Sequence, residues 1–177
     1  GKKFMRIAKK VAEKKPIIAI KGGITAAGAK ATLSHTASLA GTAAIYKAAF
    51  KQCNVVFAET LEDLFNYAKI LEKSPKPKGP MVQIITNGGG FGILATDALS
   101  TAGLQIIEPT EQTKKILKGK VSPEAILKNP IDLTGSVTTE QYRVTLEATL
   151  KDKNSDIILL ILLLQTPLIS PEIIPII

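Results

Sequence analysis

The only histidine of the chain, His35, lies in a setting that suits nucleophilic chemistry. It stands between two hydroxyl residues, Ser34 and Thr36, after the stretch 21–33, whose glycines and alanines predict a flexible loop with at most one weak turn. Neutral imidazole is a good nucleophile near pH 7. We therefore take His35 as the candidate for a covalent intermediate, with a packing or surface role as the alternative.

A glycine-rich run between a predicted strand and a predicted helix is typical of a phosphate site. Glycine lets the backbone turn sharply and approach a ligand closely, and a helix start offers unpaired N–H groups and partial positive charge. A tight turn without a ligand is the alternative. The run consists of Asn87, Gly88, Gly89, Gly90, Phe91 and Gly92.

Two nucleotide-binding motifs fit this run poorly. It lacks the Gly-Lys-Ser/Thr ending of a P-loop. A dinucleotide fingerprint would need its third glycine at Ile93, although Glu108 lies about where a ribose-binding acid would be. We therefore favour a simple phosphate site over either motif.

Two further polar residues follow predicted elements in the second half of the chain. Asp132 lies in the predicted loop 129–135, and Gln165 follows the predicted strand 156–164. Each could orient a ligand or simply end a local element. Cys53 has no partner at metal-ligand or catalytic spacing and is predicted to be a packing residue, and the absence of a Gly-x-Ser-x-Gly elbow argues against a serine hydrolase.

Strands alternating with helices predict an α/β fold with parallel sheets. Right-handed crossovers then place the loops after Lys21 and Thr86 at the carboxyl ends of strands. The predicted strands are 16–21, 55–58, 81–86, 104–107 and 156–164. The predicted helices are 4–14, 38–51, 60–71, 91–101, 110–117 and 138–151, with a helical turn at 123–127.

A proline-rich segment predicts a boundary between two domains. Residues 72–80 hold three prolines and one glycine, which cannot continue a helix or a central strand. We expect one unit at 1–72, a linker at 73–80 and a second unit at 81–177. Both units look incomplete, so we expect the chain to be part of a longer polypeptide.

Composition narrows the classes of function. The net charge is +8, but aromatic residues make up only 5% and tryptophan is absent, which argues against nucleic-acid binding. The longest apolar run, 157–164, is far shorter than the roughly 20 residues of a membrane helix. The start of the chain has no apolar signal core and there is one cysteine, so we expect a cytoplasmic protein and no membrane partner.

Five stretches, in this order and spacing, resemble acyl-CoA synthetases of the nucleoside-diphosphate-forming type, which are relatives of succinyl-CoA synthetase. The resemblance covers nearly the whole chain. The stretches are KPIIAIKGG at 15–23, SHTASLAG at 34–41, ITNGGGFG at 85–92, NPIDLTG at 129–135 and QTP at 165–167.

The resemblance implies two flavodoxin-like units. Residues 1–72 would be the later part of a CoA-ligase domain that carries the phosphohistidine, and 81–177 a second such domain, truncated at its C-terminus. His35 would become phosphorylated, and the run 87–92 would head one of two helices that face each other across the phosphate. The other helix, and a glutamate that supports the histidine, lie outside this chain. Ala37 stands where the family more often has glycine.

The implied reaction converts acyl-CoA (acetyl-CoA in part of the family), phosphate and ADP to acid, CoA and ATP through an acyl phosphate and a phosphohistidine. Coenzyme A, phosphate and ADP/ATP with Mg²⁺ are the implied ligands, the nucleotide and Mg²⁺ being bound by a domain outside this chain. The implied partners are an ATP-grasp domain or subunit and a CoA-binding Rossmann domain, in an oligomer. The alternatives are an acyl-CoA-sensing module of a protein acetyltransferase and a non-catalytic flavodoxin-like binding module.

Overall fold

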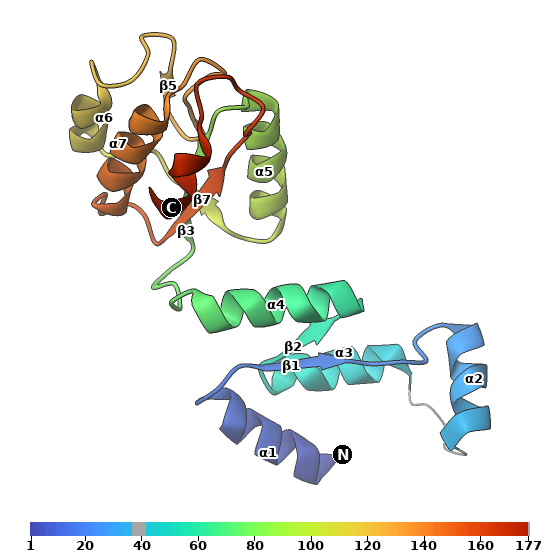
Figure 1. Cartoon of the computed structure of the whole chain (residues 1–177). Coiled ribbons are helices and arrows are strands. Elements are labelled where there is room, and N and C mark those ends of the chain that lie inside the picture. Colours follow the sequence, from blue (N-terminus) through green and yellow to red (C-terminus); the bar gives the residue numbers. More distant parts are fainter. Residues whose placement is uncertain (37–41, 177) are drawn as a thin grey trace. The chain divides into compact units, whose positions relative to one another are not determined.

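The computed structural model describes residues 1–36 and 42–176, and for residues 33–36 and 176 it describes the backbone alone. The chain divides into two compact units, residues 1–76 and 77–177 (Figure 1). No described helix combines the length and the apolar character needed to cross a bilayer.

The first unit is built on two parallel strands. Ile17 lies opposite Val55 in their register. Helix α4 covers one face of this small sheet and α1 with α3 the other, where Phe50, Cys53 and Val55 form the core (Figure 1). The elements are α1 (Lys2–Ala12), β1 (Ile17–Ile20), α2 (Ala26–Thr36), α3 (Ala43–Gln52), β2 (Val55–Ala58) and α4 (Leu61–Lys73).

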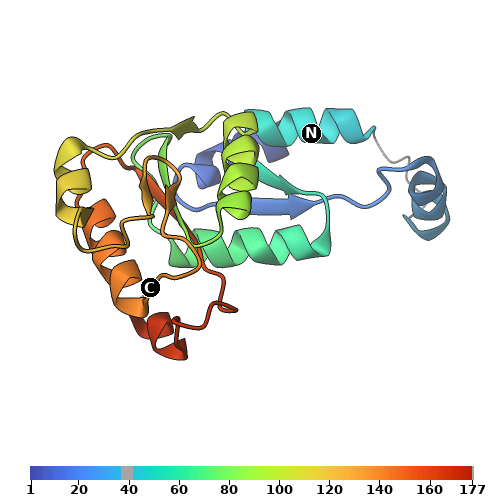
Figure 2. The same ribbon diagram turned by 90° about the horizontal axis from the view of Figure 1, so that it is seen from above.

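The predicted loop at 21–33 is wrong, because α2 occupies most of it. Four alanines, the best helix formers, stand among the first six residues of α2 and outweigh the single Gly28. Thr25 starts the helix, since its Oγ1 accepts a hydrogen bond from the Gly28 N–H at 3.1 Å. The backbone of His35 therefore belongs to the last turn of a helix instead of following a loop. Both views show α2 beyond the end of β1 (Figures 1 and 2).

Two other predictions in the first unit concern packing and helix limits. Cys53 is 1% exposed among apolar neighbours, which confirms the predicted packing role. The helix predicted from Ser38 begins at Ala43, and residues 38–41 of that prediction lie outside the described residues. Thr60 and Asp63 form a reciprocal pair of capping hydrogen bonds at the start of α4, each at 3.0 Å.

The second unit has a five-stranded sheet centred on β3. Strand β7 pairs in parallel with the length of β3 on one side, while β4 and β6 share the other side. Helix α5 covers one face, and α6 with α7 the other (Figure 1). The elements are β3 (Met81–Thr86), α5 (Gly89–Thr101), β4 (Gln105–Ile106), α6 (Glu111–Leu117), β5 (Ile126–Leu127), β6 (Ile131–Asp132), α7 (Thr139–Leu150), β7 (Ile157–Ile161) and a 3-10 helix, η1 (Pro171–Ile176).

Two predictions in this sheet need correction. The helical turn predicted at 123–127 is present only in its first part, where the Ala125 N–H donates to the Ser122 carbonyl at 3.0 Å. Ile126 and Leu127 instead form strand β5, which runs antiparallel to β6, so the sheet is not wholly parallel. The predicted loop 129–135 contributes β6. Both strands have only two residues, which is too short for a hydrophobic period to show in the sequence.

The side chain of Asn129 makes this arrangement stable. Its Oδ1 accepts from the Ile84 N–H at 3.0 Å, and its Nδ2 donates to the carbonyls of Val82 and Ile107 at 2.7 and 2.8 Å. It therefore pairs the Ile84 N–H of β3, which lies between the end of β4 and the start of β6 and would otherwise be buried without a partner, at a cost in stability. The Val82 carbonyl also accepts from the Ile107 N–H at 3.2 Å.

Candidate phosphate site

The polar residues predicted in the second unit meet at one edge of the sheet. In the register, Thr86 of β3 is opposite both Asp132 of β6 and Ile161 of β7. Asn87 and the loop that holds Gln165 continue directly from the ends of β3 and β7. The exposed Gln165 makes no hydrogen bond among the described residues. Three parallel strands thus gather these residues at their carboxyl ends, as expected for this class of sheet.

Both polar atoms of the Asn87 side chain are hydrogen-bonded within the fold. It is 3% exposed. Its Nδ2 donates to the Leu163 carbonyl at 3.0 Å and to Thr166 Oγ1 at 3.1 Å, and its Oδ1 accepts from the Leu163 N–H at 2.8 Å. The Tyr142 hydroxyl lies 2.9 Å from the same Oδ1. Only the main chain of Asn87 is therefore left for a ligand, which the sequence did not reveal.

The start of α5 offers unpaired main-chain donors. Gly88 precedes the helix, and its carbonyl accepts from the N–H groups of Phe91 and Gly92 at 3.0 and 3.2 Å. The N–H groups of Gly89 and Gly90 come before this first helical bond and have no acceptor among the described residues. Helix α5 begins at Gly89, two residues before the predicted Phe91, so both glycines lie within its first turn. An anion placed there would accept two hydrogen bonds in the positive end of the helix dipole.

Packing explains three of the four glycines in the run. A Cβ atom would overlap Leu163 at Gly88 and Asp132 Oδ2, at 2.6 Å, at Gly89, and at Gly92 it would make a tight contact with Thr86 Cγ2 at 3.1 Å. At Gly90 a Cβ atom would meet nothing within 4 Å. Its φ is not positive either, so neither packing nor backbone conformation within this unit explains why residue 90 is a glycine.

Asp132 places a carboxylate beside the same helix start. Its Oδ1 accepts from the Thr134 N–H at 2.9 Å. Its Oδ2, which accepts no hydrogen bond among the described residues, is the atom that a Cβ at Gly89 would meet. Thr134 has φ of 64°, which is rare for a β-branched residue and indicates local strain. The hydrogen bond from the Thr134 N–H holds the carboxylate in place.

The Tyr142 hydroxyl supports the site by donating a hydrogen bond to the side chain of Asn87. Burial raises its pKa above the ordinary value for tyrosine, and the negative charge of Asp132 raises that pKa further. The group therefore stays protonated at neutral pH. Its single proton is shared between two acceptors at 2.9 Å, Asn87 Oδ1 and the Ile161 carbonyl.

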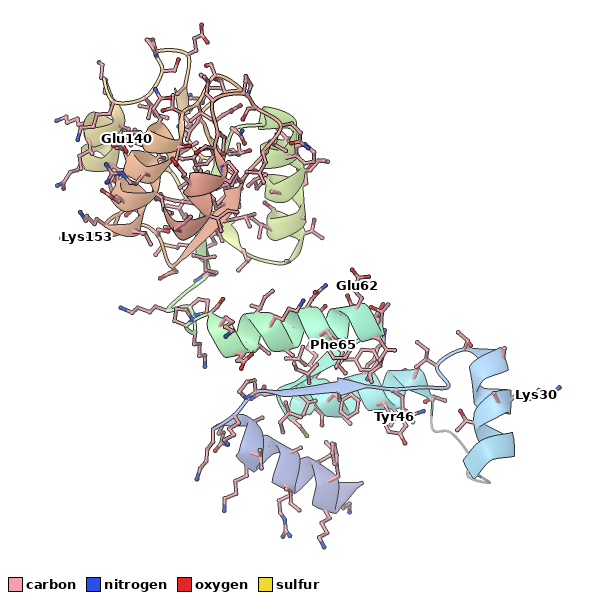
Figure 3. All side chains as sticks on the ribbon, in the orientation of Figure 1. Lys30, Tyr46, Glu62, Phe65, Glu140 and Lys153 are labelled. Atoms are coloured by element: carbon pink, nitrogen blue, oxygen red, sulfur yellow. The ribbon has the colours of Figure 1, made fainter. Side chains whose placement is uncertain are left out.

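The residues predicted in the first unit are only partly described. The backbone of Ser34, His35 and Thr36 belongs to α2, but their side chains lie outside the described part of the structure, as does Ala37 altogether. Lys30, on the same helix, extends outward (Figure 3). The assignment of His35 as the nucleophile therefore stays a prediction.

Two other features of the described residues do not compete with this site. A surface hollow of about 480 Å³ lies between α6 and α7. Its central Arg143 is paired with Glu140 and Glu147 on the outer side of α7, where Figure 3 labels Glu140. Among the described residues, no three histidine, cysteine or acidic side chains lie close enough together to hold a metal ion.

Comparisons with known proteins assign each unit to a family model. The model described as "Succinyl-CoA ligase like flavodoxin domain" matches residues 1–71, and the model described as "Ligase-CoA domain" matches residues 82–175. The second match alone covers more than half of the chain.

Relatives with curated names are larger proteins. The chain is 47% identical over 142 residues to the acetate–CoA ligase [ADP-forming] I subunit alpha of Pyrococcus furiosus, covering 80% of this chain and 30% of the relative. It is 35% identical over 153 residues to the 4-hydroxybutyrate–CoA ligase [ADP-forming] of Nitrosopumilus maritimus, covering 85% of this chain and 22% of the relative. The chain thus spans about a third or less of the length of these relatives.

A solved structure shares the fold of almost the whole chain. It is the dinucleotide-forming acetyl-coenzyme A synthetase 1 of Ca. Korarchaeum cryptofilum in complex with phosphate and ADP. The TM-score is 0.86 at 38% identity, with 96% of this chain and 36% of that one covered.

Proposed function

The chain belongs to the CoA-ligase family defined by these two domains, and from this premise we propose that it forms the phosphate-handling part of an ADP-forming acyl-CoA synthetase. The complete enzyme would convert acyl-CoA, phosphate and ADP to acid, CoA and ATP. The relatives reported above are all named as CoA ligases or synthetases, which gives the acetyltransferase-module alternative no support.

The start of α5 is the observation that carries this proposal. Transfer of a phosphoryl group needs positioning and charge stabilisation more than covalent machinery. The unpaired N–H groups of Gly89 and Gly90 supply donors, and the helix dipole supplies about half a positive charge. The open space at Gly90 leaves room for a phosphate oxygen at these donors.

We propose three steps, with His35 as the carrier. A phosphate oxygen attacks the thioester carbon, the C–S bond breaks, and the phosphate proton passes to the sulfur, giving acyl phosphate and CoA. A ring nitrogen of His35 then attacks phosphorus, and the P–O bond to the acyl group breaks with release of the carboxylate. Finally the terminal oxygen of ADP attacks phosphorus, the P–N bond breaks, and ATP forms.

The helical state of α2 changes how His35 would travel. A flexible loop up to Leu33 is excluded by the helix, so we propose that α2 moves as a rigid body. The hinge would lie just ahead of it, where Gly23 has φ of 72° and no helical hydrogen bonds constrain the backbone. The nucleotide and Mg²⁺ would be bound by an ATP-grasp domain, and CoA by a Rossmann domain, both outside this chain.

Phosphate labelling tests the proposal in the complete enzyme. With acyl-CoA and radioactive phosphate, we expect an acid-labile label on the protein that disappears in a His35→Asn variant. Ser34→Ala, which changes the neighbouring residue and leaves the imidazole, is the matched control and should keep the label. Label that persists in His35→Asn would rule out His35 as the carrier, and ATP formation by the 177-residue chain alone would overturn the need for further domains.

A further inference from the structure

We propose that Asp132 makes the start of α5 selective for a protonated oxyanion, so that hydrogen phosphate binds and sulfate is rejected. The inference rests on the proposed function, because it concerns the anion held at the same site. Phosphate and sulfate have nearly the same size and shape, and a cradle made only of main-chain N–H groups would accept both. The discrimination must therefore come from a group that responds to the proton on the anion.

The position of Asp132 gives it that role. Its Oδ2 is 2.6 Å from the point that a Cβ at Gly89 would occupy, and Cβ bonds in a helix tilt toward the N-terminus. The oxygen therefore stands at the mouth of the first turn, on the side where the N–H groups of Gly89 and Gly90 are unpaired. An anion that accepts from the Gly89 N–H is therefore placed beside this carboxylate oxygen.

The Asp132 carboxylate oxygen and an oxygen of the anion can make a favourable contact only when a proton lies between them. An ionised carboxylate only accepts hydrogen bonds, and placing two negative charges together without a donor between them is unfavourable. At neutral pH inorganic phosphate still carries at least one proton, which it can donate to Oδ2. Sulfate carries none, so its negative charge would lie beside that of Oδ2 with no hydrogen bond between them.

The local backbone keeps the carboxylate from moving aside. Oδ1 accepts a hydrogen bond from the N–H of Thr134. Thr134 has a left-handed backbone conformation although β-branched residues disfavour it. Between them, Leu133 is 1% exposed, and its N–H donates to the Thr86 carbonyl at 2.8 Å. No ion pair with a described cation neutralises Asp132. The charge is therefore fixed and available to the ligand.

Titration of the complete enzyme with sodium phosphate and with sodium sulfate at constant ionic strength tests this inference, because the resemblance places the opposing helix of the site outside this chain. The readout is the NMR shift of the Gly89 and Gly90 amides. We expect the unaltered enzyme to bind phosphate at least about tenfold more tightly than sulfate, equal to about 1.4 kcal/mol. In Asp132→Asn the ratio should fall toward one, mainly because sulfate binds better. Asp97→Asn removes the same charge from the exposed surface later in α5 and should leave the ratio unchanged.

The outcomes separate this inference from the proposed function. If phosphate shifts the two amides but Asp132→Asn leaves the phosphate-to-sulfate ratio unchanged, the role of Asp132 is refuted and the phosphate site stands. If neither anion shifts them, the phosphate site itself fails, and the inference fails with it. Should Asp132→Asn not fold, Asp132→Ser, which removes the same charge with a smaller side chain, takes its place and should lower the ratio in the same way.

Discussion

The Tyr142 hydroxyl of α7 lies 2.9 Å from Oδ1 of Asn87, the residue at which β3 gives way to the glycine run. The same Oδ1 accepts from the Leu163 N–H beyond β7. One buried amide thus joins the central strand, its neighbour and a covering helix directly beneath the start of α5. The unpaired N–H groups of the site are consequently held by a rigid base, which suits a site that acts through positioning.

Substitution of Tyr142 and substitution of Asn87 should each lower the free energy of unfolding of the second unit, and the loss should be larger for Asn87. Tyr142→Phe removes one shared hydrogen bond and should cost about 1 kcal/mol. Asn87→Ala leaves the main-chain groups of Leu163 and the Tyr142 hydroxyl without this partner, so it should cost roughly 2–4 kcal/mol. Urea unfolding followed by circular dichroism measures both, with Tyr67→Phe in the first unit as the control. Equal losses in the two variants would show that the amide is not the centre of the network.

Stability of the second unit should fall at alkaline pH because of Tyr142. Burial, followed by the charge of Asp132, raises the pKa of its hydroxyl in the folded state. A raised pKa means that the stabilising contribution is complete below the unfolded value of about 10 and is lost as pH rises above it. We expect the free energy of unfolding to decline above about pH 10, with a shallower decline in Tyr142→Phe. Identical alkaline slopes in the two proteins would contradict this assignment.

Asp152 should produce the opposite dependence at acid pH. Burial works against its charge, but a hydrogen bond from Thr113 and bonds from Asn154 and Thr110 outweigh it, so the pKa lies below the ordinary value for aspartate. Its Oδ2 accepts from the Thr110 N–H at 2.8 Å, which fixes the start of α6 against the end of α7. The contribution is therefore present above the unfolded value of about 3.9 and is lost as pH falls through the lower, folded value.

The acid-side prediction is checked by unfolding Asp152→Asn between pH 2 and 6. The variant should be less stable than the unaltered chain near pH 6 and should converge with it at the lowest pH, because protonated aspartate no longer offers the charged acceptor. Asp97→Asn, on the exposed surface of α5, is the control and should run parallel to the unaltered chain. A constant difference between Asp152→Asn and the unaltered chain would mean that Asp152 acts by packing instead of charge.

The edge of the second sheet could be predicted from the sequence because a six-residue strand and the glycine run after it form it. Strand β3 is apolar apart from Gln83 and Thr86, and the glycines after it mark the turn into α5, so the position of Asn87 followed directly. The internal role of Asn87 did not, because its partners are 55 and 76 residues away along the chain. The two-residue strands β5 and β6 were missed because they are too short to show a hydrophobic period. The role of Asn129 was missed because its side chain, and not a strand, completes the ladder of β3.

Helix α2 shows a different limit. Gly22, Gly23 and Gly28 suggested a loop, yet only Gly28 lies inside the helix, while the alanines around it favour helix formation. Propensity averaged over the whole stretch therefore gave the wrong answer, and the cap at Thr25 marked the true start. The side chain of His35 lies outside the described residues, so its chemistry stays a prediction from the sequence.

The glycines at 90 and 92 should respond in opposite ways to substitution by alanine. Gly92→Ala places a Cβ 3.1 Å from Thr86 and 3.2 Å from Pro130, so it should cost about 1–3 kcal/mol of stability. Gly90→Ala meets nothing within 4 Å and replaces a poor helix former, so it should stabilise the unit by up to about 1 kcal/mol. The same methyl group fills the space through which we propose that phosphate reaches the helix start. Gly90→Ala should therefore weaken phosphate binding severalfold while raising the urea midpoint. Nothing inside the described part of the second unit opposes a side chain at residue 90, so the added methyl group can affect binding only by occupying the path of the anion. A variant that gains stability and binds phosphate as before would therefore show that the anion approaches α5 from another direction.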